Sequence, residues 1–390
     1  MGSPSNRQAF HFTSIRLKNW RNFLDIEVPL QQRVFLVGPN ASGKSNFLDA
    51  FRFLSDIVTV GGGFEEAVLK RGGVSRLRCL AARRVSDIVL QIRMGQSASR
   101  PEWEYELHFS QDSRLKPIIK KERVARNGEQ ILNRPDDDAE DKKDPDRLTQ
   151  TYLQQINANL KFRDISKFLA SVRYLHLVPQ LVRDPDRSRG RRNDPYGGDF
   201  LETLARTPEK ARNSRLKRIR DALRVAVPQL AEIKLVRNEV GDPHLQGKYE
   251  HWRPHGAWQT EDQFSDGTLR LMGLLWSAIT DTGPLLLEEP ELSLHPEVVR
   301  FIPQMFARVQ RRMNRQIITS THSSDLLRDE GIGLDEVLLL QPGENGTSVR
   351  PAKEFDEIHD LLNGGLPLAE AVLPLTRPQN AEQLSLFGDL

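Results

Sequence analysis

One stretch of the chain combines glycines, a lysine and a hydroxyl at the spacing GxxxxGK[ST], which suits phosphate binding. It consists of Gly38, Pro39, Asn40, Ala41, Ser42, Gly43, Lys44 and Ser45, followed by Asn46. An apolar run precedes it and apolar residues at helical spacing follow it. Between a strand and a helix, backbone N–H groups would face phosphates, Lys44 would reach the β- and γ-phosphates, and Ser45 would bind Mg²⁺. The stretch predicts a nucleotide site, because an incidental Gly-rich turn would need all these features to coincide.

A second group of chemically useful residues follows the apolar run 284–287, where Glu288, Glu289 and Glu291 stand close together. An apolar strand that ends in adjacent carboxylates is the Walker B pattern, although many such proteins have Asp where this chain has Glu288. We expect Glu288 to hold Mg²⁺ and Glu289 to polarise an attacking water as catalytic base. Alternatively, these glutamates could form an exposed acidic turn after a core strand and have no catalytic role. The phosphate loop in the same chain argues against that alternative.

These residues need a sheet to position them, and the patterning predicts an α/β fold. Strands expected at 284–288, 316–320 and 337–341 alternate with helices after Pro296 and Ser323, which indicates a largely parallel sheet. Apolar and polar residues alternate at 102–109, and Asn127-Gly128 favours a tight hairpin turn between 118–124 and 129–132. Together with the apolar segment 87–94, these features predict an inserted antiparallel β meander.

The intervening segments are expected to be simpler. We expect a solvated loop at 135–146, helical sequence at 148–170, a strand at 172–178 and a helix from Thr207-Pro208. The expected division is an ATPase lobe with phosphate loop and meander at 1–180, a basic loop and helical lobe at 181–263, a second part of the ATPase lobe at 264–362, and a tail at 363–390.

Composition narrows the class of protein without choosing a function. The 390 residues include one cysteine, which excludes an internal disulfide and any multi-cysteine metal site. No apolar run approaches the roughly 20 residues of a membrane-spanning helix, so we expect a cytoplasmic protein without a membrane partner. Because 56 basic residues face 53 acidic ones, nucleic-acid binding would have to rest on local clustering of charge.

Three further motifs carry a family resemblance. The run FSDGT at 264–268 resembles the signature of ABC-type ATPases, ELSLHP at 291–296 follows where that class has its D-loop, and TSTHS at 319–323 resembles its switch-histidine segment. With LKNWRNF at 17–23, the order of motifs resembles the RecF/SMC-like branch of ABC ATPases. The resemblance spans about residues 15–341 and is weakest between 95 and 264.

The resemblance implies an ATP-dependent homodimer. Each ATP·Mg²⁺ would lie between the phosphate loop of one subunit and Ser265 and Gly267 of the other. It implies catalytic roles for Glu289, His322 and Lys44, and metal binding by Ser45, Glu288 and a Q-loop glutamine. Our candidate for that glutamine is Gln180, with Gln91, Gln154 and Gln155 as alternatives.

Three features of the sequence differ from those of particular RecF/SMC-like proteins and related ABC ATPases. No heptad repeat lies between the candidate glutamine and the signature, which predicts a compact head without a coiled-coil arm. The signature FSDGT, in place of LSGGQ, disfavours a transporter motor. Because little chain follows residue 341, we do not expect the metal-dependent nuclease domain found in related nucleases.

Two segments favour macromolecular partners. Arg187, Arg189, Arg191 and Arg192 could contact DNA phosphates, or could form an ordinary solvated loop. Gln383, Leu384, Leu386 and Phe387 belong to QLSLF, which resembles the peptide that docks on the bacterial β sliding clamp; alternatively its apolar side chains pack on their own domain.

The sequence therefore favours an ATP-binding and ATP-hydrolysing protein that dimerises around ATP and acts on DNA in repair, recombination or anti-phage defence. The alternative is a nucleotide-controlled switch or scaffold that regulates a separate effector, such as a nuclease or toxin, without its own DNA binding.

Overall fold

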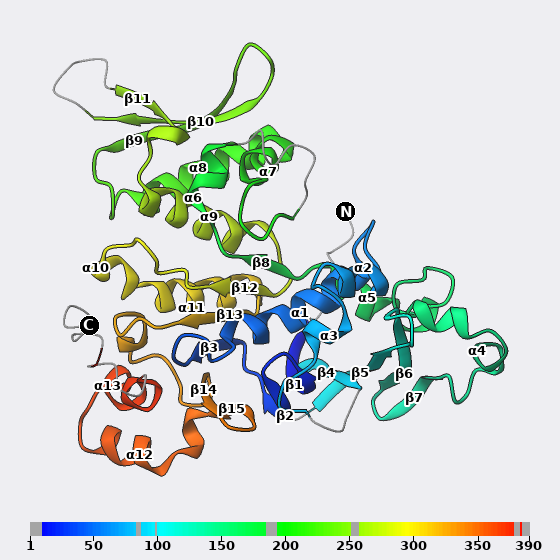
Figure 1. The fold of residues 1–390 in the computed structure, drawn as a ribbon. Coiled ribbons are helices and arrows are strands. Elements are labelled where there is room, and N and C mark those ends of the chain that lie inside the picture. The colour runs from blue at the N-terminus through cyan, green and yellow to red at the C-terminus, as the bar shows by residue number, and fades with distance from the viewer. Residues whose placement is uncertain are drawn as a thin grey trace.

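The computed structural model describes residues 10–82, 87–97, 100–184, 193–250, 257–377 and 383. Within these residues the chain forms two six-stranded sheets, a three-stranded sheet and the helices that cover them (Figure 1). The expected α/β class is confirmed.

A mostly parallel sheet lies at the centre of the molecule. Its strands, in spatial order, are β15 (Gly346–Pro351), β14 (Val337–Gly343), β3 (Arg33–Val37), β13 (Ile317–Thr321), β12 (Leu285–Glu288) and β8 (Arg173–Leu175). All neighbours are parallel except β15, which pairs antiparallel with β14. The carboxyl ends of β3, β13 and β12 therefore share one edge, which is where α/β sheets place ligands.

The predicted meander is present and belongs to a larger antiparallel sheet that includes the first two strands. Its order is β2 (Phe23–Pro29), β1 (His11–Trp20), β4 (Ile88–Ser97), β5 (Arg100–Gln111), β6 (Pro117–Arg126) and β7 (Glu129–Arg134). Along β5, Trp103, Tyr105 and Leu107 are buried, while Glu104 and Glu106 pair with basic side chains of neighbouring strands. This is the alternation of a sheet with one face in the core.

The helix α1 (Lys44–Val58) packs between these two sheets. Its Phe47, Phe51 and Leu54 are fully buried in a core shared with residues from both sheets. Because side chains alternate along β3, Val34 and Leu36 join this core, whereas Phe35 and Val37 join a second core on the other face. The short helices α2 (Phe64–Leu69), α3 (Val74–Leu77) and α5 (Arg163–Ala170) complete this half.

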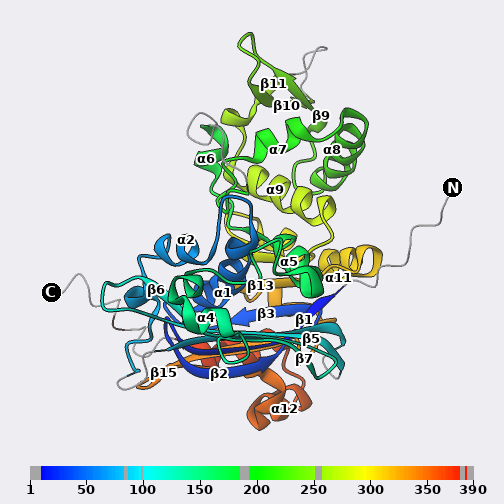
Figure 2. The ribbon, with the colours of Figure 1, turned by 90° about the vertical axis from the view of Figure 1, so that its right-hand side faces the viewer.

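The second core joins the parallel sheet to the remaining helices. These are α6 (Pro179–Arg183), α7 (Phe200–Arg206), α8 (Glu209–Leu223), α9 (Asp266–Thr280), α10 (Pro296–Val299), α11 (Ile302–Met313), α12 (Asp356–Asn363) and α13 (Leu368–Val372). Helices α6 to α8 form a lobe above the parallel sheet in Figures 1 and 2. The predicted helix from Thr207-Pro208 is confirmed by α8.

The helical lobe also carries a small antiparallel sheet that the sequence did not indicate. Its strands are β9 (Leu230–Arg237), β10 (Pro243–Tyr249) and β11 (Ala257–Thr260), in the order β11-β10-β9. Leu230, Ile233 and Leu245 turn into the second core. The lobe therefore contains both helices and strands.

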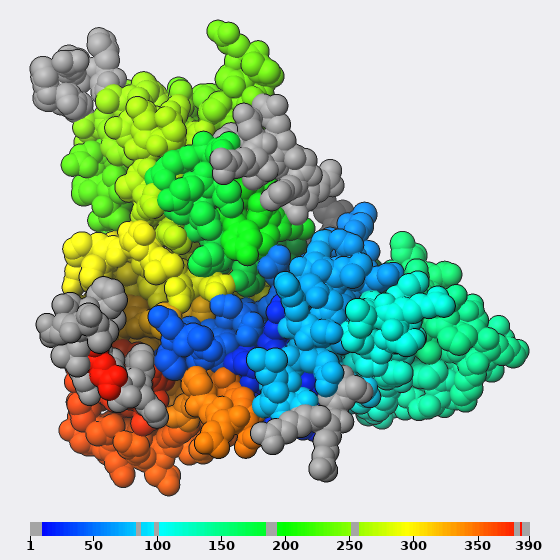
Figure 3. Space-filling model, in the orientation of Figure 1, coloured from blue at the N-terminus to red at the C-terminus, as the bar shows by residue number. Residues whose placement is uncertain are grey.

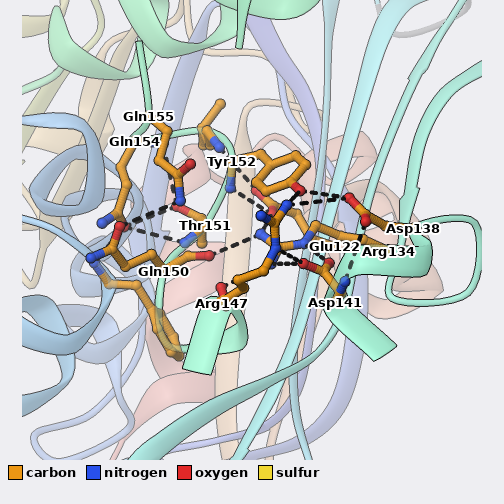
Figure 4. A network of polar contacts seen from close by, with 12 residues as sticks. Glu122, Arg134, Asp138, Asp141, Arg147, Gln150, Thr151, Tyr152, Gln154 and Gln155 are labelled. Carbon is orange, nitrogen blue, oxygen red and sulfur yellow. Dashed lines mark hydrogen bonds and ion pairs between the residues drawn. The ribbon is translucent and has the colours of Figure 1, made fainter. Parts of the chain in front are cut away.

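The segment 135–146 is not a simple solvated loop. It contains α4 (Ala139–Lys143), whose Asp141 is only 1% exposed. Asp141 receives hydrogen bonds from Arg134, which also donates to Glu122 (Figure 4). The prediction was wrong because an acidic run can supply the partner of a buried arginine as readily as it can face water.

Arg134 is fully buried and uses all five of its N–H donors. Its Nε donates to Asp141, Nη1 to Glu122 and the Gln150 carbonyl, and Nη2 to Asp141 and the Arg147 carbonyl. Glu122 in turn accepts the backbone N–H groups of residues 152 and 153. The network fixes segment 135–155 on the edge of the antiparallel sheet.

Other local expectations also need correction. The helix expected at 148–170 is confined to α5, and the strand expected at 172–178 to β8. A single 3₁₀ turn, Leu326–Arg328, stands in place of the helix expected after Ser323. The expected tail after residue 363 begins with packed structure, since Ala369, Ala371 and Val372 of α13 are buried.

Two parts of the chain protrude at the molecular surface, the segment around α4 and the helical lobe. In Figure 3 the segment around α4, β6 and β7 protrudes to one side of the two large sheets. The helical lobe lies above those sheets in the same view. In the described part of the chain, no helix is both long enough and apolar enough to cross a bilayer.

Candidate functional site

The phosphate loop connects the buried strand β3 to α1. Two of its residues have left-handed backbone, Ala41 at φ 62° and Gly43 at φ 98°. A side chain on Gly43 would also collide with Asn22, whose Nδ2 donates to the Ser42 carbonyl over 2.8 Å. Asn22 further accepts from Asn46 Nδ2. The N-terminus of α1 carries no acidic residue in its first turn, so its positive end is available to an anion.

Lys44 lies under this loop and is only 6% exposed. Its Nζ donates to the carbonyls of Gly38, at 2.8 Å, and Pro39, at 3.0 Å. Burial lowers the pKa of Lys44, and the nearby glutamates 289, 288 and 291 oppose that shift. The ammonium group of Lys44 therefore lies against the loop carbonyls, and the side chain can extend from this position toward a bound phosphate.

Glu288 ends β12 between two hydroxyl groups. Ser45 Oγ donates to its Oε1 and the Tyr174 hydroxyl donates to its Oε2. His176 Nδ1 lies 3.3 Å from the Glu288 carbonyl oxygen. Burial, followed by the charge of Glu288, raises the pKa of Tyr174, so Tyr174 stays a hydrogen-bond donor. A serine hydroxyl beside a carboxylate is an oxygen donor set that fits Mg²⁺.

Glu289 turns away from the strand and pairs with His322. Its backbone is left-handed at φ 44°, and its N–H bonds to the Ser320 carbonyl on β13 at 3.2 Å. Its Oε1 lies 2.6 Å from His322 Nε2, while His322 Nδ1 is 3.5 Å from Lys44 Nζ. The hydrogen bond from His322 lowers the pKa of Glu289, which favours the carboxylate. Three elements therefore bring Glu289, His322 and Lys44 into one chain of contacts.

Glu291 was not assigned a role from the sequence, yet it supports His322. Its Oε1 accepts from the Thr321 hydroxyl at 2.5 Å and from the His322 N–H at 3.2 Å. Burial raises the pKa of Glu291. Its position three residues after Glu288 in a D-loop-like run was the available signal.

The signature residues lie at the N-terminus of α9. Ser265 is exposed and caps the helix by accepting the Thr268 N–H at 3.2 Å. A side chain on Gly267 would come within 2.5 Å of the Ser293 carbonyl oxygen, so only glycine allows the D-loop-like segment to approach. Arg183 of α6 donates to the Phe264 carbonyl and to Asp266, both at 2.6 Å. The signature is therefore fixed from two sides.

The structure does not bring Gln180 into this group. Gln180 is exposed on α6, and no contact among the described residues joins it to Glu288 or Ser45. Gln154 instead accepts the Phe64 N–H, and Gln91 lies within β4. Tyr174, which does contact Glu288, was missed because the sequence does not reveal that β8 pairs with β12.

The remaining predicted residues are outside what the structure describes. Arg187, Arg189, Arg191 and Arg192 lie outside the described residues, as do Leu384, Leu386 and Phe387. Gln383 is described and exposed.

Comparisons with solved structures return SMC head domains. The Smc head with an extended coiled coil bound to the C-terminal domain of ScpA, from Pyrococcus furiosus, is 10% identical over 91% of this chain and 100% of that chain, with a TM-score of 0.49. The SMC head domain from Thermotoga maritima is 15% identical over 87% and 98%, with a TM-score of 0.42. None of the curated proteins matches the chain.

A family match covers the phosphate loop, the signature, Glu288, Glu289 and His322. Residues 33–329, from the strand before the phosphate loop to beyond His322, match the family described as "AAA domain, putative AbiEii toxin, Type IV TA system". With the parallel sheet order and the phosphate loop between β3 and α1, the fold is that of a P-loop NTPase, an ABC-type ATPase head with an antiparallel sheet and a small lobe. Since the match spans most of its length, the chain belongs to this family of AAA-domain proteins.

Proposed function

We propose that the protein binds ATP·Mg²⁺, dimerises head to tail around it and hydrolyses it to ADP and phosphate. The observation that carries the proposal is the contact chain from Glu289 through His322 to Lys44, beside Ser45 and Glu288. At the carboxyl edge of the parallel sheet it joins Glu289 as the base, His322 as a polar residue near the γ-phosphate, and Lys44 as the cation that binds phosphate.

Each residue has a distinct role in this proposal. The α1 N-terminus and Lys44 bind the phosphates, while Ser45 and Glu288 would hold Mg²⁺, which would supply positive charge to the phosphoryl group. Glu289, kept as carboxylate by His322, accepts a proton from the attacking water. Asn22 fixes the conformation of the loop by its hydrogen bonds to Ser42 and Asn46.

The second subunit is proposed because the signature does not reach its own phosphate loop. Among the described residues, no hydrogen bond or ion pair joins Ser265 or Asp266 to residues 38–46. Ser265 is exposed at a helix N-terminus, where its hydroxyl and nearby N–H groups can meet the γ-phosphate bound by another copy.

Steady-state ATP hydrolysis tests this proposal. Lys44→Ala should abolish hydrolysis and nucleotide binding, because it removes the cation that meets the phosphates. Lys70→Ala is the matched control, since Lys70 is exposed and its one ion pair among the described residues is with Glu66, four residues earlier. Hydrolysis by Lys44→Ala at the rate of Lys70→Ala would contradict the assignment of the site.

We further propose that the ATP-bound dimer contacts DNA through Arg187, Arg189, Arg191 and Arg192. The support is the position of Arg183, which precedes this loop and bonds to both Phe264 and Asp266 of the signature. A ligand on the loop could therefore alter the signature and the ATPase rate. The expected result is DNA binding that needs ATP and weakens steeply with salt.

The family description favours a second candidate, a nucleotide-controlled component of a toxin system that regulates a separate effector. DNA binding that is lost when all four arginines are changed to alanine supports the first candidate. Absence of DNA binding at low salt, with stable association with an effector encoded nearby, supports the second. Docking of the tail on the β sliding clamp stays a prediction, which deletion of residues 383–387 would test by loss of clamp binding.

A further inference from the structure

A groove with a basic rim lies on the face opposite the phosphate loop's helix, over α9 and between α8 and α11. Figures 1 and 2 both place α9 between these two helices. The groove has a volume of about 490 Å³ and is partly open to solvent. The residues that line it come from these three helices alone.

The floor of the groove is apolar. Leu275, Ala278 and Ile279 of α9 form its base, and Met305 and Met313 of α11 form one wall. The two methionines and the leucine are partly buried against the second core, so part of each side chain stays uncovered. Methionine is unbranched and adapts its shape to different apolar partners.

The rim carries three arginines and no carboxylate. Arg308 and Arg312 stand on α11 and Arg218 faces them from α8. All three are exposed, and within the described part of the chain none has an ion pair or side-chain hydrogen bond. Other arginines of the helical lobe do have acidic partners, as Arg220 has Asp221 and Arg206 has Glu202. The groove is thus locally positive in a chain of nearly balanced charge.

The geometry points to an acidic amphipathic helix of a partner protein as the ligand of this groove. Along α11 the residues 305, 308, 309, 312 and 313 repeat at i, i+3, i+4, i+7 and i+8, so they form one continuous helical face. A helix laid along it would place apolar residues at i, i+4 and i+7 on the floor and Asp or Glu beside the arginines.

Nucleic acid fits this groove less well. Arginines on a rim can bind phosphates, but the lining contains no aromatic side chain on which bases could stack. Phosphate binding would leave the methionine and leucine surface uncovered, whereas an apolar helix face removes it from water. Charge and apolar surface together therefore favour a peptide.

Selection from a displayed library of random peptides of about 15 residues would test the proposal. The library is selected on the full chain and counter-selected on Arg308→Glu/Arg312→Glu. We expect enriched sequences with apolar residues at i, i+4 and i+7 flanked by Asp or Glu. In fluorescence anisotropy, the double substitution should weaken an enriched peptide at least about tenfold, since charge-assisted contacts are lost and like charges are opposed.

Arg311→Glu is the matched control, because Arg311 is exposed on the same helix but does not line the groove. It should leave affinity within about twofold, as expected for a charge outside the contact. Recovery of basic or patternless peptides, or equal effects of Arg311→Glu and the double substitution, would overturn the proposal. So would peptide affinity that appears only after deletion of residues 378–390, which would identify the chain's own tail as the occupant, or duplex DNA binding that the double substitution abolishes.

Discussion

Glu288 is held by two hydroxyl groups from opposite sides, Ser45 at the start of α1 and Tyr174 on β8. A glutamate reaches further than the aspartate more usual at this position, and the phenol fixes the orientation that the extra methylene would otherwise leave free. Tyr174 also lies under the Arg52 guanidinium, 5.4 Å from its ring centre. Tyr174 is therefore a positioning residue for the proposed metal ligand.

Tyr174→Phe should raise the Mg²⁺ concentration needed for half-maximal ATP hydrolysis about tenfold or more, because outer hydrogen bonds to a metal ligand have effects of that size. The maximal rate should change less. Tyr196→Phe is the control, since Tyr196 is 44% exposed, its ring contacts the edge of the His176 ring, and within the described residues its hydroxyl has no hydrogen bond to Glu288. A Mg²⁺ titration that does not distinguish the two variants would remove Tyr174 from this role.

The sequence indicated which polar residues belong to the site but not all of their neighbours. Lys44, Ser45, Glu288, Glu289 and His322 stand in motifs with local spacing, and the structure brings them together. Tyr174 and Gln180 are different, because their distance from Glu288 depends on which strand pairs with β12. Strand order is a property of the whole sheet, and no local pattern around residues 174 or 180 records it.

At the scale of elements, the antiparallel sheet depends on a buried ionic network at its edge. Glu122 and Arg134 are fully buried, and Glu122 accepts hydrogen bonds from Tyr105, Arg134 and two backbone N–H groups. Arg134 also lies 3.9 Å from the centre of the Tyr152 ring. These contacts attach segment 135–155 to β6 and β7.

Glu122→Ala should lower the free energy of unfolding by about 3–5 kcal/mol, because it removes one of the two carboxylates that pair with the buried Arg134 and leaves the N–H groups of residues 152 and 153 without their acceptor. Glu140→Ala, on exposed α4 surface, removes only the pair with Lys143 and should cost less than about 1 kcal/mol. Urea denaturation of both variants is the measurement. Equal midpoints would show that the network contributes no net stability.

Elements with a strong local pattern were predictable, and those defined by tertiary contacts were not. The alternation at Trp103, Tyr105 and Leu107 identified β5, and the apolar spacing after Gly43 identified α1. The small sheet β9 to β11 was missed because the buried face of β10 carries Pro243 and Gly247 beside Leu245, which weakens the apolar half of its alternation. Likewise, α4 looked solvated because only its contact with Arg134 makes Asp141 a buried residue.

For the whole molecule, the proposal requires two copies. One edge of the parallel sheet offers the phosphate loop and Glu289, and the N-terminus of α9 offers Ser265. Gly267 packs against Ser293, so the signature and the D-loop-like segment form one surface. That joint surface is what a second copy would meet, and ATP between the two copies would hold them together.

The solution mass of Glu289→Gln with and without ATP·Mg²⁺ tests the central claim most directly. Without the catalytic carboxylate, ATP should persist, so the mass should rise from that of one 44.5 kDa chain to twice that value only when ATP·Mg²⁺ is present. Lys44→Ala/Glu289→Gln should not respond. If Glu289→Gln binds a fluorescent ATP analogue yet keeps the same mass with and without ATP·Mg²⁺, the head-to-tail dimer is contradicted.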